Sequence, residues 1–163
     1  MSVIASDFRR ALGQFATGVT VVTTLDAARR PLGLTVNAFS AVSLDPPLVL
    51  VCIDNRSETH GGFEASRVFG VSVLEEGQEA WSQRFAFGDA EKFASPLLTG
   101  ETGVPLVPHA LAHIECRVTS TLPGGDHTIY VGEVVRLDVS PGRPLLYHAS
   151  AYRRLDGSDN GSK

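Results

Sequence analysis

One stretch decides the fold of this chain: residues 33–53, which read GLTVNAFSAVSLDPPLVLVCI. Small and polar residues fill its first half, residues 35–43, and an unbroken apolar run fills residues 48–53 after a corner at Pro46 and Pro47. Small side chains let a flat ligand approach the backbone, and Thr, Asn and Ser add donors and acceptors. The pattern therefore predicts a polar binding strand followed by a core strand. An ordinary edge strand followed by a buried strand is the alternative.

Length and composition indicate one soluble domain. The chain has 163 residues, of which 43% are hydrophobic, and that is enough apolar material for a single core. We assign the domain to residues 1–155 and expect residues 156–163, which are polar and rich in Gly and Ser, to be a disordered tail.

Charge and cysteine content exclude several classes of protein. The net charge of -4, with 14 scattered Lys and Arg residues, gives no basic face for nucleic acid. The N-terminus is charged where a signal peptide needs apolar residues, and no apolar run approaches the roughly 20 residues that span a bilayer. Cys52 and Cys116 lie in apolar surroundings and are expected to be buried, reduced thiols. We therefore expect a cytoplasmic protein without nucleic-acid or membrane partners.

The other periodicities predict several strands and a few short helices. Phe8, Leu12 and Phe15 form one apolar stripe of a helix that covers a barrel end or a partner surface. Weaker helices are expected from Ser57 to Phe63 and over residues 75–86, the latter with Trp81 and Phe85 packed inward. Further strands are expected at 19–24, 68–74, 112–119, 127–139 and 144–152. Several short strands separated by turns favour a mostly β barrel over alternating βαβ units.

The clearest hairpin spans residues 111–139. Its first strand alternates apolar residues with His113, Glu115, Arg117 and Thr119, which predicts one buried face and one wetter face. Residues 123–126, which read PGGD, supply the turn. The segment 95–108, rich in Gly and Pro, is expected to be an irregular connection.

Familiar catalytic motifs are absent from the sequence. No G-x-G-x-x-G follows a strand, no P-loop is present, and there is no G-x-S-x-G elbow. The five histidines form no H-x-H or H-E-x-x-H pair, so a metal site is disfavoured. A few polar residues remain as candidates. Arg56 and Ser57, before a helix start, can hold an anion or simply cap the helix, and Arg84 is either a solvated charge or an anion ligand.

In their order along the chain, several segments resemble the short-chain flavin reductases with an FMN-binding split barrel, the reductase components of two-component flavin-dependent monooxygenases. The resemblance covers residues 8–155 and rests on these segments: FRRALGQFATGVTVVTT, GLTVNAFSAVSLDPPLVLVCIDNRS, FGVSVL, the RFA and KF pieces of RFAFGDAEKF, GDHTIYVGEV and PLLYHASAYRRL. It implies a Greek-key split β-barrel that forms a homodimer, with the flavin in a groove at or near the subunit interface.

The same resemblance implies roles for individual residues. Residues 35–40 would lie along the isoalloxazine and bind it through backbone groups, Arg56 with Ser57 would hold the phosphate, and two tyrosines would lie near the nicotinamide unless they pack in the core. The implied cofactor-binding residues are Thr35, Val36, Asn37, Ala38, Ser40, Cys52, Ile53, Asp54, Arg56, Ser57, Arg84, Phe85, Tyr147 and Tyr152. His127, in the GDH motif, is the implied catalytic residue, with a histidine satisfied by its own turn as the alternative.

The implied reaction is hydride transfer from NADH or NADPH to FMN or FAD, and the reduced flavin would diffuse to a separate monooxygenase. The cofactors carry the difficult chemistry, so no general base need be visible. The alternative is a flavin-binding electron carrier that retains its flavin. Two departures from the family pattern, Ser72 in place of Asn and residues 149–151 in place of Gly, predict altered specificity.

Overall fold

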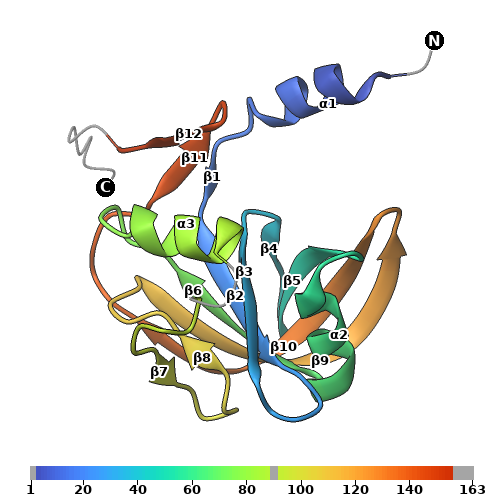
Figure 1. The fold of residues 1–163 in the computed structure, drawn as a ribbon, viewed down its shortest axis with the longest axis vertical. Coiled ribbons are helices and arrows are strands. Elements are labelled where there is room, and N and C mark those ends of the chain that lie inside the picture. Colours follow the sequence, from blue (N-terminus) through green and yellow to red (C-terminus); the bar gives the residue numbers. More distant parts are fainter. Residues whose placement is uncertain (1–2, 89–91, 156–163) are drawn as a thin grey trace.

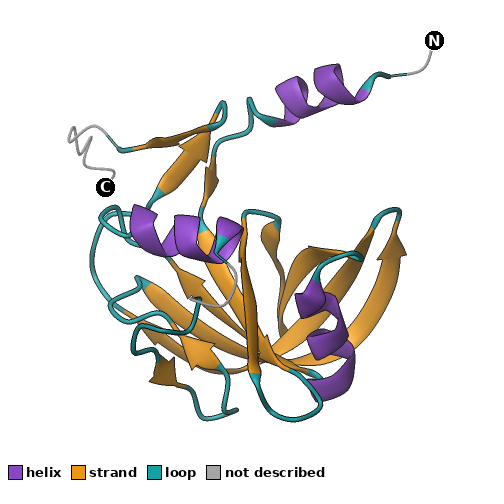
Figure 2. Cartoon of the chain, in the orientation of Figure 1, coloured by secondary structure: helices purple, strands orange, loops and turns teal. Residues whose placement is uncertain are grey.

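One seven-stranded antiparallel sheet carries most of the strands (Figures 1 and 2). The computed structural model describes residues 3–88 and 92–155, so the predicted tail at 156–163 lies outside the described residues. In spatial order the sheet runs β3-β2-β6-β9-β10-β5-β4. Its strands are β2 (Thr20–Leu25), β3 (Pro31–Val36), β4 (Phe39–Leu44), β5 (Pro47–Asp54), β6 (Val68–Val73), β9 (Ala112–Gly124) and β10 (His127–Val139).

The two edge strands of this sheet, β3 and β4, follow each other directly in sequence. Asn37 and Ala38 join them, and the Cys52 N–H donates to the Ala38 carbonyl at 3.1 Å. The prediction of one polar strand over residues 35–43 is therefore wrong: the chain leaves β2 after Val36 and pairs with β5 instead. Helix α2 (Glu58–Ser66) contacts β2, β3 and β5, so it covers the opening between the edges. The described ladders leave the sheet open at this place.

Three apolar clusters form the core, the smallest of them at Leu25, Val104 and Leu106. One lies inside the curled sheet and includes Val51, Phe63, Phe69 and Tyr130, with the Phe63 and Tyr130 rings stacked at 4.6 Å between centroids. Another lies beneath helix α3 (Glu79–Phe87) and centres on Phe85. Trp81 packs against this second cluster, which confirms the inward pair predicted for the helix.

Strand β5 is less uniformly buried than its apolar sequence predicted. Val49, Val51 and Ile53 are buried, whereas the residues between them are only half-buried because successive side chains of a strand point to opposite faces. Cys52 is one of the half-buried residues, so the prediction of a buried thiol is wrong for it. The prediction of a buried thiol is confirmed for Cys116, and burial raises the pKa of this thiol to about 12.

The hairpin of β9 and β10 is confirmed, with its turn narrowed to Gly125 and Asp126. The wetter face predicted for β9 is wrong at Glu115, which is 3% exposed. Its carboxylate accepts the N–H groups of Glu101 at 3.0 Å and Thr102 at 2.7 Å, and the Thr102 hydroxyl at 2.6 Å. The connection that contains β7 (Leu98–Thr99) and β8 (Pro105–Leu106) covers this face at Glu115, while Arg117 and Thr119 on the same face stay exposed.

Two helices differ from the sequence prediction. Helix α3 begins at Glu79 rather than near Glu75, because the Glu75 carboxylate accepts the Gly77 N–H at 2.8 Å and holds a turn there. Helix α1 (Ala5–Leu12) contains Phe8 and Leu12 of the predicted stripe but ends before Phe15; it buries no residue and projects away from the sheet (Figure 1). Its stripe stays exposed within one chain, with Phe8 at 55% and Leu12 at 57%.

A second, small sheet stands above α3. Its order is β1-β11-β12, with strands β1 (Thr17–Gly18), β11 (Leu146–His148) and β12 (Ala151–Arg153) (Figure 2). The single strand predicted over residues 144–152 is therefore wrong. Ala149 and Ser150 turn the chain in the left-handed region, at φ 49° and 61°, and so divide it into a hairpin.

Replacing Ala149 or Ser150 by glycine should stabilise the protein. A side chain in the left-handed region costs roughly 1–2 kcal/mol, and the greater entropy of unfolded glycine offsets part of that gain. We expect each variant to raise the free energy of unfolding by about 0.5–1 kcal/mol, measured by urea denaturation. Ala151→Gly, in the adjoining strand β12, is the matched control and should lower it; equal effects at all three positions would contradict the argument.

Candidate functional site

The edge strand β3 borders several cavities, two of which contain residues implied by the family resemblance. Pro31, Gly33 and Thr35 point to one face because side chains alternate along a strand. The tyrosine cavity, about 650 Å³, is lined by Val19, Thr35, Asn37, Ser82, Gln83, Ala86, Phe87, Tyr147, Ser150, Ala151 and Tyr152. The serine cavity, about 480 Å³, is lined by Pro31, Leu32, Gly33, Ser57, Glu58, Thr59, Lys92 and Phe93. A ligand lying along β3 would therefore enter both.

Ser82 links the elements around the tyrosine cavity. Its hydroxyl accepts from the Tyr152 hydroxyl at 2.9 Å, and its carbonyl accepts from the Thr35 hydroxyl at 2.5 Å. The Tyr147 and Tyr152 rings meet edge to face, with centroids 5.6 Å apart. Ser82 was not among the predicted site residues, because a buried serine on a helix has no signal of its own in the sequence. These hydrogen bonds hold β3, α3 and β12 together as three walls of the tyrosine cavity. Thr35 on β3 and Tyr152 on β12 offer polar and aromatic groups to a flat ligand.

The serine cavity has the properties of an anion site. Ser57 is the N-cap of α2, and its hydroxyl accepts the Thr59 N–H at 3.3 Å, as the capping alternative predicted. Lys92 reaches the same cavity, where its ammonium group lies 3.5 Å from the Gly33 carbonyl oxygen. A helix start, a hydroxyl and an ammonium group together favour a phosphate, against the opposing charge of Glu58, which lines the same cavity. Lys92 belongs to the KF piece of the family resemblance, which implied no role for it.

Arg56 does not accompany Ser57 into this cavity. Its guanidinium forms a two-point ion pair with Asp54, with Nη2 to Oδ2 at 2.8 Å and Nε to Oδ1 at 3.1 Å. Hydrogen bonding to this guanidinium holds the pKa of the Asp54 carboxyl well below its usual range. The two residues expected to hold one phosphate thus point to different places, and Arg56 is engaged with Asp54.

His127 lies at the start of β10, opposite Asp54 in the pairing with β5. Its Nδ1 is 2.7 Å from Oδ1 of Asp126, and this hydrogen bond lowers the pKa of that carboxyl. A carboxylate at Nδ1 favours a proton there, which leaves Nε2 as the group available to a ligand. The ring is half exposed and lines neither cavity.

Asn55, in the turn before α2, forms hydrogen bonds to the end of the β9–β10 hairpin that carries His127. The Asn55 N–H donates to the Asp126 carbonyl at 3.0 Å, and the Thr128 hydroxyl donates to Asn55 Oδ1 at 2.7 Å. His60 Nε2 lies 3.0 Å from the same Thr128 hydroxyl oxygen. None of these three contacts was predicted, because each joins the start of β10 or the turn before it to a segment about 70 positions away in sequence.

Several implied site residues have side chains turned away from the cavities. Phe85 is 1% exposed and packs beneath Gly33, while Arg84 lies over the Trp81 ring at 4.7 Å and bonds the Ser95 hydroxyl. Val36 and Ile53 are buried in the core, so only their backbone groups can face a ligand. Ala38, Ser40 and Cys52 lie with Asn37 around the crossing from β3 to β4. Thr35, Asn37, Ser57, Tyr147 and Tyr152 line the cavities.

The departure at Ser72 is part of the scaffold. The side chain is 1% exposed, and its hydroxyl accepts the Val107 N–H at 3.0 Å. Among residues 3–88 and 92–155, no group of three or more His, Cys, Asp or Glu side chains is placed to hold a metal. In the same ranges, no helix is long and apolar enough to cross a membrane.

Comparison with known proteins identifies the family. A family model described as "Flavin reductase like domain" matches residues 12–156. The chain belongs to this flavin reductase-like family. The match extends over nearly the whole described fold, so both cavities lie inside the family domain.

Members of the flavin reductase-like family resemble the chain over most of their length. An NADH-dependent flavin reductase from Rhodococcus sp. is 41% identical over 150 residues, which cover 91% of this chain and 85% of that protein. The reductase subunit of a flavin-dependent monooxygenase from Rhodococcus jostii is 40% identical over 91% of this chain and 77% of its own. The solved NADH:FAD oxidoreductase of Streptomyces globisporus, in complex with NAD and FAD fragments, superposes with a TM-score of 0.90 at 39% identity, over 98% of this chain and 99% of that one.

Proposed function

We propose that this chain is an NADH-dependent flavin reductase that reduces FMN or FAD and supplies the reduced flavin to a separate monooxygenase. One observation carries the proposal: a single edge strand, β3, borders an aromatic cavity at one end and an anion cavity nearer the other. A flavin phosphate combines a flat ring with an anion on a flexible chain, which fits this arrangement. The names of the relatives above support the same activity.

In this proposal the isoalloxazine lies between Thr35 and the crossing at Asn37 and Ala38, bound by backbone groups. The phosphate occupies the serine cavity, held by Ser57, the first turn of α2 and Lys92. Arg56, which is paired with Asp54 and does not line the serine cavity, takes no direct part in holding the phosphate. When bound, the flavin supplies the hydride-accepting chemistry, and the chain supplies position and electrostatics.

The proposed part of His127 is to orient the nicotinamide through Nε2, which the bond from Nδ1 to Asp126 leaves free. Tyr147 and Tyr152 offer aromatic faces for stacking at the tyrosine cavity. No residue is proposed as a general base, because hydride transfer requires only that the nicotinamide and the flavin ring be held at near-attack distance.

Replacing His127 by alanine should lower turnover while leaving flavin binding intact. We expect kcat to fall about tenfold, because the nicotinamide loses one orienting hydrogen-bond acceptor, and the dissociation constant of the flavin to change less than twofold. Stopped-flow kinetics and fluorescence titration measure the two quantities. Asp126→Asn retains a hydrogen-bond partner and should lose less. Complete loss of flavin binding in the alanine variant would assign His127 to the flavin site instead.

We also propose that two chains form a split-barrel homodimer in the cytoplasm. The uncovered apolar stripe of α1, with Phe8 and Leu12, supports a second copy as its cover, since stripes of this kind are normally buried. The two free cysteines fit a reducing compartment. Light scattering tests the assembly, and the mass of a single chain at micromolar concentration would contradict it.

An anaerobic assay tests the function. Purified protein receives NADH and a many-fold excess of free FMN or FAD, and nicotinamide absorbance is followed. Oxidation of NADH in proportion to added flavin supports the reductase. Oxidation that stops at one equivalent per chain would indicate an electron carrier that keeps its flavin, and no oxidation with either flavin would refute both.

A further inference from the structure

His127 follows a hairpin turn that has little packing of its own. It is the first residue of β10 and pairs with Asp54, the last residue of β5, so this strand pairing ends at His127. In the turn, Gly125 adopts φ 75°, and a Cβ atom at this position would meet nothing within 4 Å. Asp126, which bonds the His127 ring, is itself 80% exposed in the same turn. The direction of the ring is therefore only as well defined as the position of the turn.

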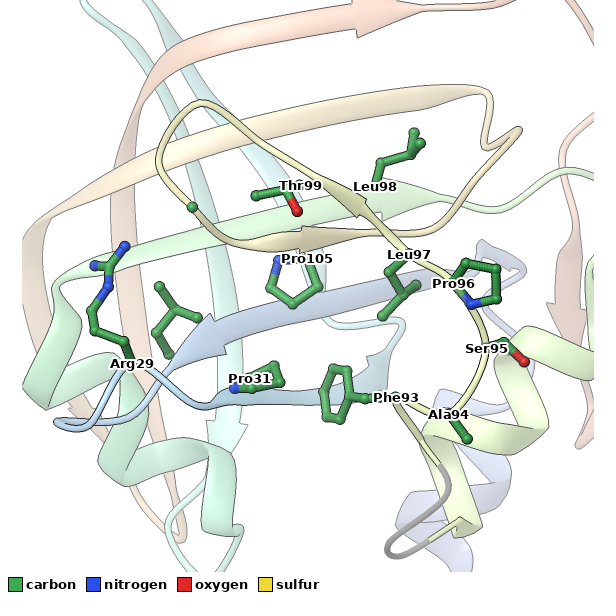
Figure 3. A pocket seen from close by; sticks show the side chains of 12 residues that line it. Arg29, Pro31, Phe93, Ala94, Ser95, Pro96, Leu97, Leu98, Thr99 and Pro105 are labelled. Atoms are coloured by element: carbon green, nitrogen blue, oxygen red, sulfur yellow. The ribbon is translucent and has the colours of Figure 1, made fainter.

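The cavities along β3 give the ring no support. His127 lines neither the tyrosine cavity nor the serine cavity. A third cavity, about 500 Å³, lies between the start of β3 and the connection that contains β7 and β8, and Figure 3 shows Pro31 and Phe93 on one side of it and Pro105 on the other. None of its lining residues belongs to the β9–β10 hairpin. The ring is therefore held through the hydrogen bonds of the hairpin and not by a cavity wall.

Asn55 bonds the hairpin on both sides of His127. Before the histidine, the Asn55 N–H donates to the Asp126 carbonyl at 3.0 Å, and the side-chain amide nitrogen lies 3.5 Å from the Gly125 carbonyl oxygen. After the histidine, Oδ1 of Asn55 accepts the Thr128 hydroxyl at 2.7 Å. One residue of a neighbouring turn thus fixes the backbone that enters His127 and the side chain that follows it.

Thr128 connects this arrangement to helix α2. Its hydroxyl hydrogen is donated to Asn55, so Nε2 of His60, 3.0 Å from the same oxygen, is the donor in the second contact. The His60 ring meets the Tyr130 ring edge to face, with centroids 5.9 Å apart, and the Tyr130 hydroxyl donates to Glu64 of α2 at 2.8 Å. A continuous set of contacts therefore joins the turn that carries His127 to a helix of the folded core.

We propose that Asn55 and Thr128 are positioning residues for the hydride transfer: they hold the His127 ring so that its Nε2 meets the nicotinamide. This inference rests on the proposed function and goes further, because it assigns the accuracy of that contact to two residues that line neither the tyrosine cavity nor the serine cavity. A small displacement of an orienting group lowers the rate of the step that it orients. The effect of losing either residue should therefore appear in turnover through His127 and leave flavin affinity unchanged.

A double-mutant cycle with His127→Ala tests the proposal. Thr128→Val removes the hydroxyl and keeps the shape of the side chain, whereas Thr128→Ser keeps the hydroxyl. With NADH and excess free FMN in the absence of oxygen, Thr128→Val should lower kcat about fivefold, the size of one neutral hydrogen bond, and Thr128→Ser less than about twofold. His127→Ala alone should lose about tenfold, and adding Thr128→Val should cause no further loss, whereas independent effects would multiply to about fiftyfold.

Asn55→Ala tests the same hydrogen bond from its other partner. Asn55 is exposed, so this variant should fold even if Thr128→Val does not. It should lower kcat about fivefold, again only while His127 is present. Thr119→Val is the matched control, because Thr119 is an exposed residue of the same hairpin whose hydroxyl donates to the Val131 carbonyl at 3.2 Å. The control should keep the wild-type kcat, and the dissociation constant of FMN should stay within about twofold in every variant.

Three results would overturn the proposal. Losses that multiply in the cycle would show that the two residues support the fold in general and not the His127 ring. A tenfold rise in the dissociation constant of FMN in Asn55→Ala would place Asn55 at the flavin site. An unchanged kcat in His127→Ala would leave no ring to position. Reduction of free FMN by the wild type reports on the proposed function separately, because it does not depend on which residue orients the nicotinamide.

Discussion

Replacing Gly33 by valine should lower the free energy of unfolding by about 3 kcal/mol and weaken flavin binding more than tenfold. A Cβ atom at this position would lie 2.8 Å from Cε1 of Phe85 and 3.1 Å from Cγ2 of Thr23. The Phe85 ring cannot move aside, since it is 1% exposed and packs edge to face with Phe93 at 5.4 Å. The strand must therefore shift away from α3, and its groups would no longer match the two cavities.

Urea denaturation and flavin fluorescence titration measure both effects in the Gly33 variant. Gly61→Ala is the matched control, because a Cβ there meets nothing within 4 Å and the residue lies in helix α2. That control should gain about 0.5–1 kcal/mol from helix propensity and bind flavin normally. A Gly33→Val protein that retains full stability and affinity would show that β3 is not clamped between α3 and β2.

The second large effect is expected at Glu115. Replacement by alanine leaves three donors, the N–H groups of Glu101 and Thr102 and the Thr102 hydroxyl, without their buried acceptor. Hydrogen bonds to charged groups contribute about 1.5–3 kcal/mol each, but the loop can relax toward water, so a loss of about 3–4 kcal/mol is expected. Such a loss is a large fraction of the stability of an ordinary domain.

Thermal and urea unfolding measure the Glu115 effect. The neighbouring Glu101 provides the control, because its ion pair with Arg136, at 3.5 Å, joins two exposed side chains. Exposed pairs contribute about 0–1 kcal/mol, so Glu101→Ala should be close to neutral. Similar losses in the two variants would mean that the buried bonds of Glu115 do not hold the connection.

Local patterns of the sequence were sufficient to predict most elements. The alternation in β9, the turn after it and the stripe of α1 each depend on residues within a few positions of one another, where periodicity is informative. The ordered segments from Phe8 to Leu155 were also sufficient to indicate the family, which the match to residues 12–156 confirms.

Features that depend on distant residues were not predictable in this way. The polar stretch 35–43 has the composition of one strand. It is divided because its first residues pair with β2 and its later residues pair with β5. The alternation of β9 predicts that Glu115 faces water. The donors that bind its carboxylate lie in a connection about 14 residues earlier in the chain, which the pattern of β9 does not reveal. Ala149 and Ser150 carry no glycine signal, although they adopt the conformation that glycine favours.

The candidate site was predicted better as a region than as a set of side chains. The family resemblance directed attention to Thr35, Asn37 and Ser57, which line the cavities. It also suggested Arg56, whose local partner Asp54 is only two positions away. Ser82 and Lys92 were not predicted as site residues, because their positions depend on how α3 and the segment after it pack against β3.

The order of strands also bears on how the protein assembles. Three pairs, β2 with β3, β4 with β5 and β9 with β10, join neighbours in sequence and can form early, whereas β6 with β9 and β5 with β10 require distant parts of the chain to meet. Asn37 and Ala38 connect the first two of these pairs, which become opposite edges only in the finished sheet. A ligand bound along β3 and this connection thus recognises the completed fold. By mass action it should stabilise the whole sheet, raising the unfolding temperature as its concentration increases.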